Sequence, residues 1–132
     1  MSDVPAEAEE LLTTGREMAH LATSVNDRPH AATVWYYYED GEVEILTGGK
    51  KLENVQANPR VALSIERSEN GHGQWWVVLR GTAEAVFDED EKWAARERLF
   101  RRYRDRDPSL EEDGEPPEAL VRVDVGSVAY SS

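Results

Sequence analysis

The middle of the chain, residues 42–66, has the sequence EVEILTGGKKLENVQANPRVALSIE. This stretch predicts a strand over 42–47 and a short helix that opens at Gly48-Gly49 and stops at Asn58-Pro59. We expect Leu52 and Val55 to turn inward from that helix. A second strand is predicted over 60–66, because its apolar residues alternate with small and polar ones.

Toward the N-terminus, residues 7–19 are predicted to form an amphipathic helix, because Leu11, Leu12, Gly15, Met18 and Ala19 recur at helical spacing. From residue 20 onward the spacing of apolar residues becomes typical of strands. Strands are predicted over 20–25 and 30–38, the latter rich in β-branched and aromatic residues, with a turn over 26–29 between them. Asp40-Gly41 predicts a further hairpin turn, because this pair tolerates positive φ angles.

Toward the C-terminus, a glycine-containing loop over 68–74 precedes a long predicted strand over 75–87, in which Gly81 marks a bulge or bend. A helix is then predicted from Asp88, its N-cap, with Glu91 as capping-box partner and Asp107-Pro108 as its end. Its expected buried residues are Trp93, Leu99, Phe100 and Tyr103. An exposed acidic loop over 108–117 and a last strand over 120–125 follow. About six strands and three helices favour one mainly β domain over residues 1–132, a closed antiparallel barrel decorated by helices.

Composition narrows the functional classes. The chain has 132 residues and no cysteine, which excludes disulfides, thiolate metal sites and a cysteine nucleophile. A formal net charge of −12 disfavours nucleic acids and anionic membranes as partners, and the chain shows neither a signal peptide nor an apolar stretch of membrane-spanning length. We therefore expect a cytoplasmic location. Only Lys50, Lys51 and Lys92 are lysines, a scarcity on an acidic chain that suggests a halophile.

The sequence Gly48-Gly49-Lys50-Lys51 is the one local candidate for a binding site. Two lysines at the start of a helix oppose its macrodipole by about 0.3–1 kcal/mol each unless an anion lies between them and the free N–H groups. The glycines allow the backbone to approach a ligand, and Thr47 adds a hydroxyl. A phosphate or carboxylate site and a pair of solvated surface lysines are equally compatible with these residues alone. The flanking residues of a Walker motif are missing.

Other constellations are weaker. His20, His30 and His72 lack metal-ligand spacing, so no metal site is predicted, and no serine lies in a nucleophile elbow. Of the neighbouring pair Trp75 and Trp76, one must face outward or into a subunit contact, because adjacent strand residues point to opposite faces. Such an exposed aromatic surface favours a dimer.

Several strings, in this order and spacing, resemble the pyridoxamine 5'-phosphate oxidase-like FMN-binding split barrels. They are His20-Leu21-Ala22-Thr23, Arg28-Pro29-His30, Val34-Trp35-Tyr36, Thr47 with Lys50-Lys51, Asn58-Pro59-Arg60-Val61-Ala62-Leu63, and Gly81-Thr82-Ala83-Glu84. The resemblance spans about residues 8–128 and implies a six-stranded antiparallel split barrel of Greek-key type in a short member of the family. The acidic, lysine-poor composition suggests that this member is haloarchaeal. The resemblance also implies a homodimer with cofactor sites at the interface.

The resemblance assigns cofactor-binding positions to this chain. Thr33, Val34 and Trp35 match the strand whose backbone borders the isoalloxazine ring of FMN. Thr47, Gly49, Lys50 and Lys51 match the phosphate-binding segment, and Trp76 falls where a side chain often reaches the ring system. This chain has Ala32 and Tyr37 where the vitamin oxidases carry basic residues and Gly49 where they carry serine, and it ends at Ser132 without their C-terminal elements. Vitamin oxidase activity is therefore not carried over.

Three functions remain open at this point. The first is an FMN-dependent oxidoreductase acting on a small molecule, in which the flavin supplies the redox chemistry. The second is a reductase that uses a deazaflavin coenzyme in the same site. The third is a carrier or sensor that binds flavin or haem without catalysis. The sequence nominates no general acid or base and does not indicate the substrate.

Overall fold

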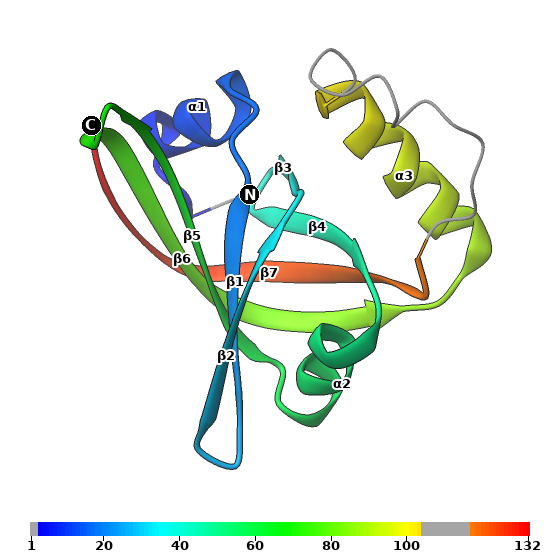
Figure 1. Ribbon diagram of the computed structural model, residues 1–132. Coiled ribbons are helices and arrows are strands. Elements are labelled where there is room, and N and C mark those ends of the chain that lie inside the picture. Colours follow the sequence, from blue (N-terminus) through cyan, green and yellow to red (C-terminus); the bar gives the residue numbers. More distant parts are fainter. Residues whose placement is uncertain (1–2, 104–116) are drawn as a thin grey trace.

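The computed structural model describes residues 3–103 and 117–132 and shows an antiparallel sheet with three helices packed around it (Figure 1). The elements in chain order are α1 (Ala6–Thr14), β1 (Ala19–Val25), β2 (Arg28–Val34), β3 (Tyr37–Glu39), β4 (Glu42–Thr47), α2 (Gly49–Ala57), β5 (Arg60–Glu69), β6 (His72–Val86), α3 (Glu89–Tyr103) and β7 (Ala119–Ser131). The strands join in the order β2-β1-β5-β6-β7-β4-β3, and every pairing is antiparallel. The predicted mainly β split barrel is confirmed, with seven strands instead of six.

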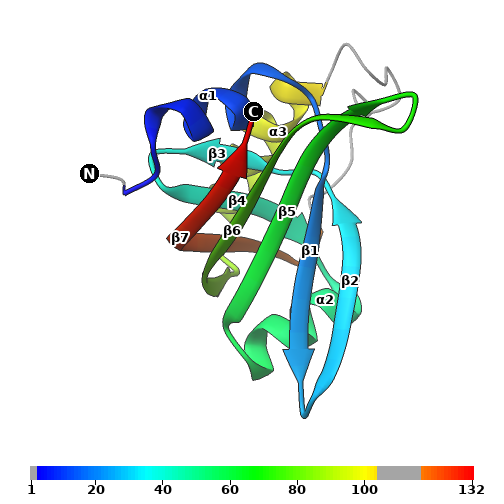
Figure 2. The same ribbon diagram turned by 90° about the vertical axis from the view of Figure 1, so that its left-hand side faces the viewer.

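The inner face of the curved sheet forms the hydrophobic core. Burial alternates along β1 and β5, where Leu21, Leu63 and Ile65 point inward and their neighbours point out. Leu52 and Val55 of α2 are buried in the same core, as predicted. Both views place α1 and α2 at opposite ends of the barrel (Figures 1 and 2).

The extra strand arises because the predicted strand over 30–38 is interrupted. At the break, Trp35 stacks on Tyr103 of α3 with ring centroids 4.6 Å apart. The backbone N–H of Tyr36 donates to the Tyr103 hydroxyl at 3.2 Å rather than to a neighbouring strand. A side chain from α3 therefore replaces the sheet hydrogen bond at this position and separates β2 from β3.

Three hairpins share one turn chemistry. The pairs Asn26-Asp27, Asp40-Gly41 and Asn70-Gly71 all have positive φ angles, as two-residue turns of the primed type require. The prediction at Asp40-Gly41 is confirmed. The predicted loop over 68–74 is wrong, because Asn70-Gly71 closes the β5–β6 hairpin directly, and the predicted turn over 26–29 is too long, because β2 already begins at Arg28.

The first helix is shorter than predicted. It ends at Thr14, and Gly15 is extended with φ −104° and ψ −171°. The hydroxyls of Thr13 and Thr14 donate to carbonyls one turn back at 2.9 Å, which satisfies part of the helix end. Ala19, predicted to be helical, instead pairs in β1 with Val34 and Ile65, so sheet pairing prevails over the helical spacing.

Helix α3 has the predicted N-cap, since the Glu91 N–H donates to Asp88 Oδ2 at 3.0 Å. Its buried face differs from the prediction: Trp93 is 45% exposed, and Lys92 is buried instead. Lys92 can be buried because its Nζ donates to the Glu118 carbonyl and pairs with Glu89. Leu99 and Tyr103 are buried as predicted, and Phe100 is half-buried. The predicted helix end at Asp107-Pro108 and the acidic loop up to residue 116 lie outside the described residues.

Gly81 forms the predicted bulge, where the register between β6 and β7 shifts between Arg80 and Gly81. A Cβ atom at Gly81 would overlap the backbone carbonyl of Asp124 across the bulge. The last strand, predicted over 120–125, extends over the whole of β7 and pairs with β6 as far as Ser131.

Candidate functional site

The turn from β4 into α2 presents an uncapped helix N-terminus. Gly49 has φ +61°, a region that favours glycine, and a Cβ atom there would meet no atom within 4 Å. Gly48 takes the N-cap position without a side-chain hydrogen bond, and the first turn contains no acidic residue. Thr47 is buried, and its hydroxyl lies 3.5 Å from the Gly48 carbonyl oxygen. The first N–H groups of α2 are therefore available to an anion.

Lys50 and Lys51 lie in this first turn, as predicted. Lys50 is exposed and Lys51 half-buried, and within residues 3–103 and 117–132 neither forms a salt bridge. Two positive charges next to the positive end of a helix destabilise it unless a negative group balances them. One carboxylate, that of Glu118, lies beside Gly48, where a Cβ atom would be 3.1 Å from Glu118 Oε1. An anionic ligand at the first turn would share this end of the helix with Glu118.

A polar pocket of about 390 Å³ lies between the β1–β2 hairpin and α2. We call it the hairpin pocket; its described lining residues are Val25, Asn26, Arg28, Pro29, His30, Lys50 and Asn54. Lys50 and Asn54 are one helical turn apart on α2 and so share a face. Asn54 is buried, and its Nδ2 donates to Thr23 Oγ1 at 3.0 Å. Lys51 does not line this pocket.

Two further basic side chains approach Lys50 from the strand side. Arg28 and His30 come from the start of β2, and the Nδ1 atom of His30 is buried without a hydrogen-bond partner. A buried polar atom without a partner costs about 1–3 kcal/mol, which a ligand can recover. The three basic side chains that line the pocket fit a phosphate group chemically. Thr47, Gly48 and Gly49 at the helix start are not among its lining residues.

The predicted ring-binding residues lie at the other end of β2. Thr33 is exposed, Val34 is buried and Trp35 is half-buried. Because the ring of Trp35 is committed to Tyr103, Trp35 can border a planar ligand only through its backbone. From Arg28 to Thr33 the strand extends about 16 Å at about 3.3 Å per residue, so phosphate and ring would occupy opposite ends of β2.

Trp76 is not part of this arrangement within one chain. It lies on β6, with β1 and β5 between it and β2, so about 14 Å of sheet separates the two strands. The Trp76 side chain is 44% exposed, whereas Trp75 is half-buried against the core, which confirms that one of the pair faces outward.

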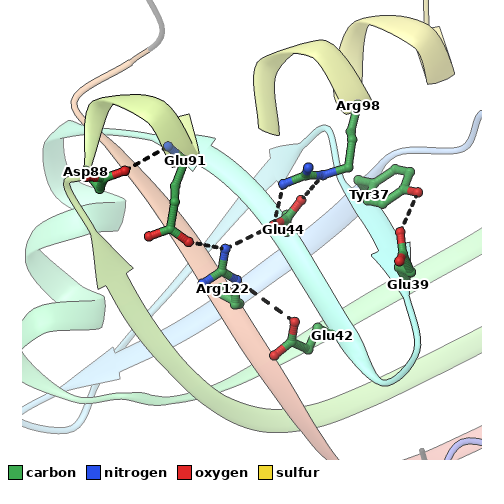
Figure 3. A network of polar contacts seen from close by, with 8 residues as sticks. All are labelled: Tyr37, Glu39, Glu42, Glu44, Asp88, Glu91, Arg98 and Arg122. Carbon is green, nitrogen blue, oxygen red and sulfur yellow. Dashed lines mark hydrogen bonds and ion pairs between the residues drawn. The ribbon is translucent and has the colours of Figure 1, made fainter. Parts of the chain in front are cut away.

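A second polar cluster lies where α3 packs on β4 and β7 (Figure 3). Glu44 of β4 accepts hydrogen bonds from Arg98 Nε at 2.7 Å and Nη2 at 2.9 Å, and Arg122 Nη2 lies 3.3 Å away. Arg122 also contacts Glu91 at 3.1 Å. Hydrogen bonding to Glu44 raises the pKa of Arg98 further above its ordinary value, although partial burial opposes this. The groups pair with one another, so this cluster attaches α3 to the sheet.

Sequence reasoning did not assign Arg28, His30 or Asn54 to the site. By sequence, Arg28 lies in a predicted turn and His30 begins a predicted strand, and neither has an assigned binding role. Their role depends on the β1–β2 hairpin folding beside α2, and no local pattern shows this. Within the described residues, no three histidine, cysteine or carboxylate side chains gather as a metal site.

No helix in the described part of the chain is long and apolar enough to cross a membrane. Among solved structures, the chain matches a FAD-binding protein from Mesorhizobium loti with a TM-score of 0.73 and 24% identity, covering 96% of this chain and 94% of that one. A conserved hypothetical protein from Mycobacterium tuberculosis matches with a TM-score of 0.76 and 24% identity over 98% and 84%. An F420 reductase matches with a TM-score of 0.68 and 23% identity over 91% and 94%.

At these identities the structural matches show a shared fold. No curated protein matches the sequence. The family model described as pyridoxamine 5'-phosphate oxidase matches residues 5–130, nearly the whole chain. The chain therefore belongs to the pyridoxamine 5'-phosphate oxidase family.

Proposed function

We propose that the protein binds a flavin-type cofactor, FMN in the first instance, and uses it to oxidise or reduce a small molecule. The hairpin pocket at the start of α2 carries this proposal, because it concentrates basic groups on a chain of net charge −12. Family membership and a FAD-binding structural neighbour support a flavin as the ligand.

In this proposal each end of the cofactor has its own binding residues. Lys50, Lys51 and the N–H groups that begin at Gly49 hold the phosphate, beside Thr47. The backbone of Thr33, Val34 and Trp35 borders the ring. When bound, the flavin supplies hydride or electron transfer, while the protein orients it and sets its electrostatic environment.

We further propose a homodimer, which would bring Trp76 of the partner subunit to the ring. The outer face of β1, β5 and β6 carries small side chains such as Ala22, Ala62 and Ser64, and no helix crosses it (Figure 2). Trp76 and Val78 add apolar area to this face. A sheet surface with small side chains and no covering helix suits self-association.

A deazaflavin-dependent reductase is the second candidate, and the F420 reductase neighbour favours it. The same basic pocket would hold a phosphorylated deazaflavin tail. Parallel titrations with FMN and with a deazaflavin coenzyme separate the two, because the native cofactor should bind more tightly. A protein that binds either compound tightly but shows no turnover with any electron donor tested would be a carrier.

The decisive experiment compares FMN affinity in wild type, Lys50→Ala and Arg67→Ala, followed by quenching of flavin fluorescence. Lys50→Ala should weaken binding by about 1.5–3 kcal/mol, the value of a charge-assisted hydrogen bond. Arg67→Ala is the charge-matched control, because Arg67 is exposed on β5 near the far hairpin turn. Failure of the wild type to bind either FMN or deazaflavin contradicts the proposal, and equal affinities in all three proteins place the phosphate elsewhere.

The dimer has its own test. Trp76→Glu places a charge on the proposed interface and should convert the dimer to a monomer in light scattering after size exclusion. Glu69→Gln, at an exposed position near the hairpin turn, should leave the mass unchanged. A wild type that is monomeric at tens of micromolar contradicts the proposed assembly.

A further inference from the structure

His30 occupies an unusual position in the hairpin pocket. Its side chain lies on the inner side of edge strand β2 and is half-buried. The Nδ1 atom is buried and has no hydrogen-bond partner. The nearby amide of Asn54 is already bonded to Thr23, which is also the cross-strand neighbour of His30. His30 thus lines a basic pocket and carries an imidazole nitrogen without a hydrogen-bond partner.

The groups around His30 are basic or neutral. Lys50 faces the pocket from α2, Arg28 lies two residues earlier on β2, and Asn26 belongs to the hairpin turn. No carboxylate is found among the described residues that line the pocket. Asp27 lies in the adjacent hairpin turn but does not line the pocket. A protonated imidazole would add a third positive charge to the lining, which an anionic ligand would balance.

We propose that His30 is a pH-dependent ligand of the cofactor phosphate. This inference rests on the proposed function. In its cationic form, His30 donates a hydrogen bond from Nδ1 to a phosphate oxygen that Lys50 and Arg28 also contact. Because only the cationic imidazole makes this charge-assisted contact, its contribution grows as the solution becomes more acidic. The same contribution is absent for a cofactor without a phosphate.

The test measures dissociation constants of FMN and of riboflavin, which lacks the phosphate, for wild type and His30→Gln at pH 5.5 and 8.0 and constant ionic strength. His72→Gln is the matched control, because His72 is exposed at the distant β5–β6 turn. The phosphate of FMN itself gains a proton near pH 6. This effect cancels in the ratio of variant to wild type at each pH.

His30→Gln should weaken FMN binding about tenfold at pH 5.5 and less than threefold at pH 8.0, since a charge-assisted hydrogen bond is lost only where the imidazole is charged. Riboflavin affinity should not change at either pH. Calorimetry at pH 7.0 in buffers of different ionisation enthalpy should show more proton uptake on FMN binding to wild type than to His30→Gln.

The outcomes separate the two proposals. FMN binding that falls with Lys50→Ala but not with His30→Gln overturns the role of His30 and leaves the proposed function intact. An equal loss at both pH values, or an equal loss for riboflavin, overturns the pH-dependent phosphate contact. Absence of FMN binding to the wild type at both pH values overturns the proposed function together with this inference.

Discussion

Replacing Glu44 by glutamine should destabilise the protein by about 2–3 kcal/mol, because Glu44 is the acceptor on which α3 is anchored. Glu44 is only 7% exposed and accepts two hydrogen bonds from Arg98 and one from Arg122. A glutamine side chain keeps the shape but loses the charge, and only one of its two terminal atoms can accept. The Arg98 guanidinium stays charged in the variant.

The magnitude follows from the exposure of the three side chains. Removing one partner of a fully buried pair costs about 3–5 kcal/mol, whereas an exposed pair contributes about 0.2–1 kcal/mol. The exposed fractions of the side chains are 10% for Glu44, 26% for Arg98 and 24% for Arg122. The contact is therefore closer to the buried case than to the exposed one, and we expect a cost between the two values. Arg122 keeps Glu91 as a partner, so most of the loss falls on Arg98.

Urea unfolding of wild type, Glu44→Gln, Arg98→Gln and the double variant measures this loss. The double-mutant cycle should give a coupling energy of about 1 kcal/mol or more, because the two residues share a bidentate contact. Glu42→Gln is the control: its half-exposed carboxylate lies 3.9 Å from Arg122, so the loss should stay below about 0.5 kcal/mol. The reasoning is refuted if Glu44→Gln costs no more than Glu42→Gln, or if the cycle is additive.

Two more predictions concern the barrel. Gly81→Ala should lower the free energy of unfolding by about 1–3 kcal/mol in urea, because its Cβ would overlap backbone at the bulge, whereas Gly73→Ala, in open space on the same strand, should be nearly neutral. Burial raises the pKa of Tyr36 despite the opposing charge of Arg102, so the folded state holds the phenol proton more tightly than the unfolded chain. Stability should therefore be complete below about pH 10 and fall above it, and Tyr36→Phe should show a shallower alkaline loss when unfolding is followed across pH 9–11.5.

The sequence identified the fold through local signals that tertiary contacts did not override. The strand over 42–47 and the helix that follows agree with β4 and α2 because alternation, turn glycines and the Asn58-Pro59 stop all act locally. The break between β2 and β3 was not predictable, since it depends on a hydroxyl from α3. Lys92 was missed for a similar reason, because its burial depends on a carbonyl 26 residues away.

The candidate site also contains some residues that local sequence could identify and others that only tertiary packing brings in. The lysines at the start of α2 were recognisable, because helix electrostatics is a short-range property. Arg28 and His30 join them only through the packing of the β1–β2 hairpin beside α2. Three further statements are proposals: the homodimer, the choice of cofactor and the ring-binding role of Thr33–Trp35. The first depends on a second copy of this chain, and the other two depend on a bound cofactor.

Edge strand β2 connects the basic pocket to the α3 anchor, because different elements hold its two ends. Its start lies beside α2, where His30 and Lys50 line one pocket. Just beyond its end, Trp35 stacks on Tyr103 of α3, and α3 is itself fixed to β4 and β7 through Glu44. The proposed phosphate and ring positions therefore depend on separate contacts. A change in the α3 anchor acts on the ring end through Trp35, while the basic pocket at the other end keeps its own support from α2.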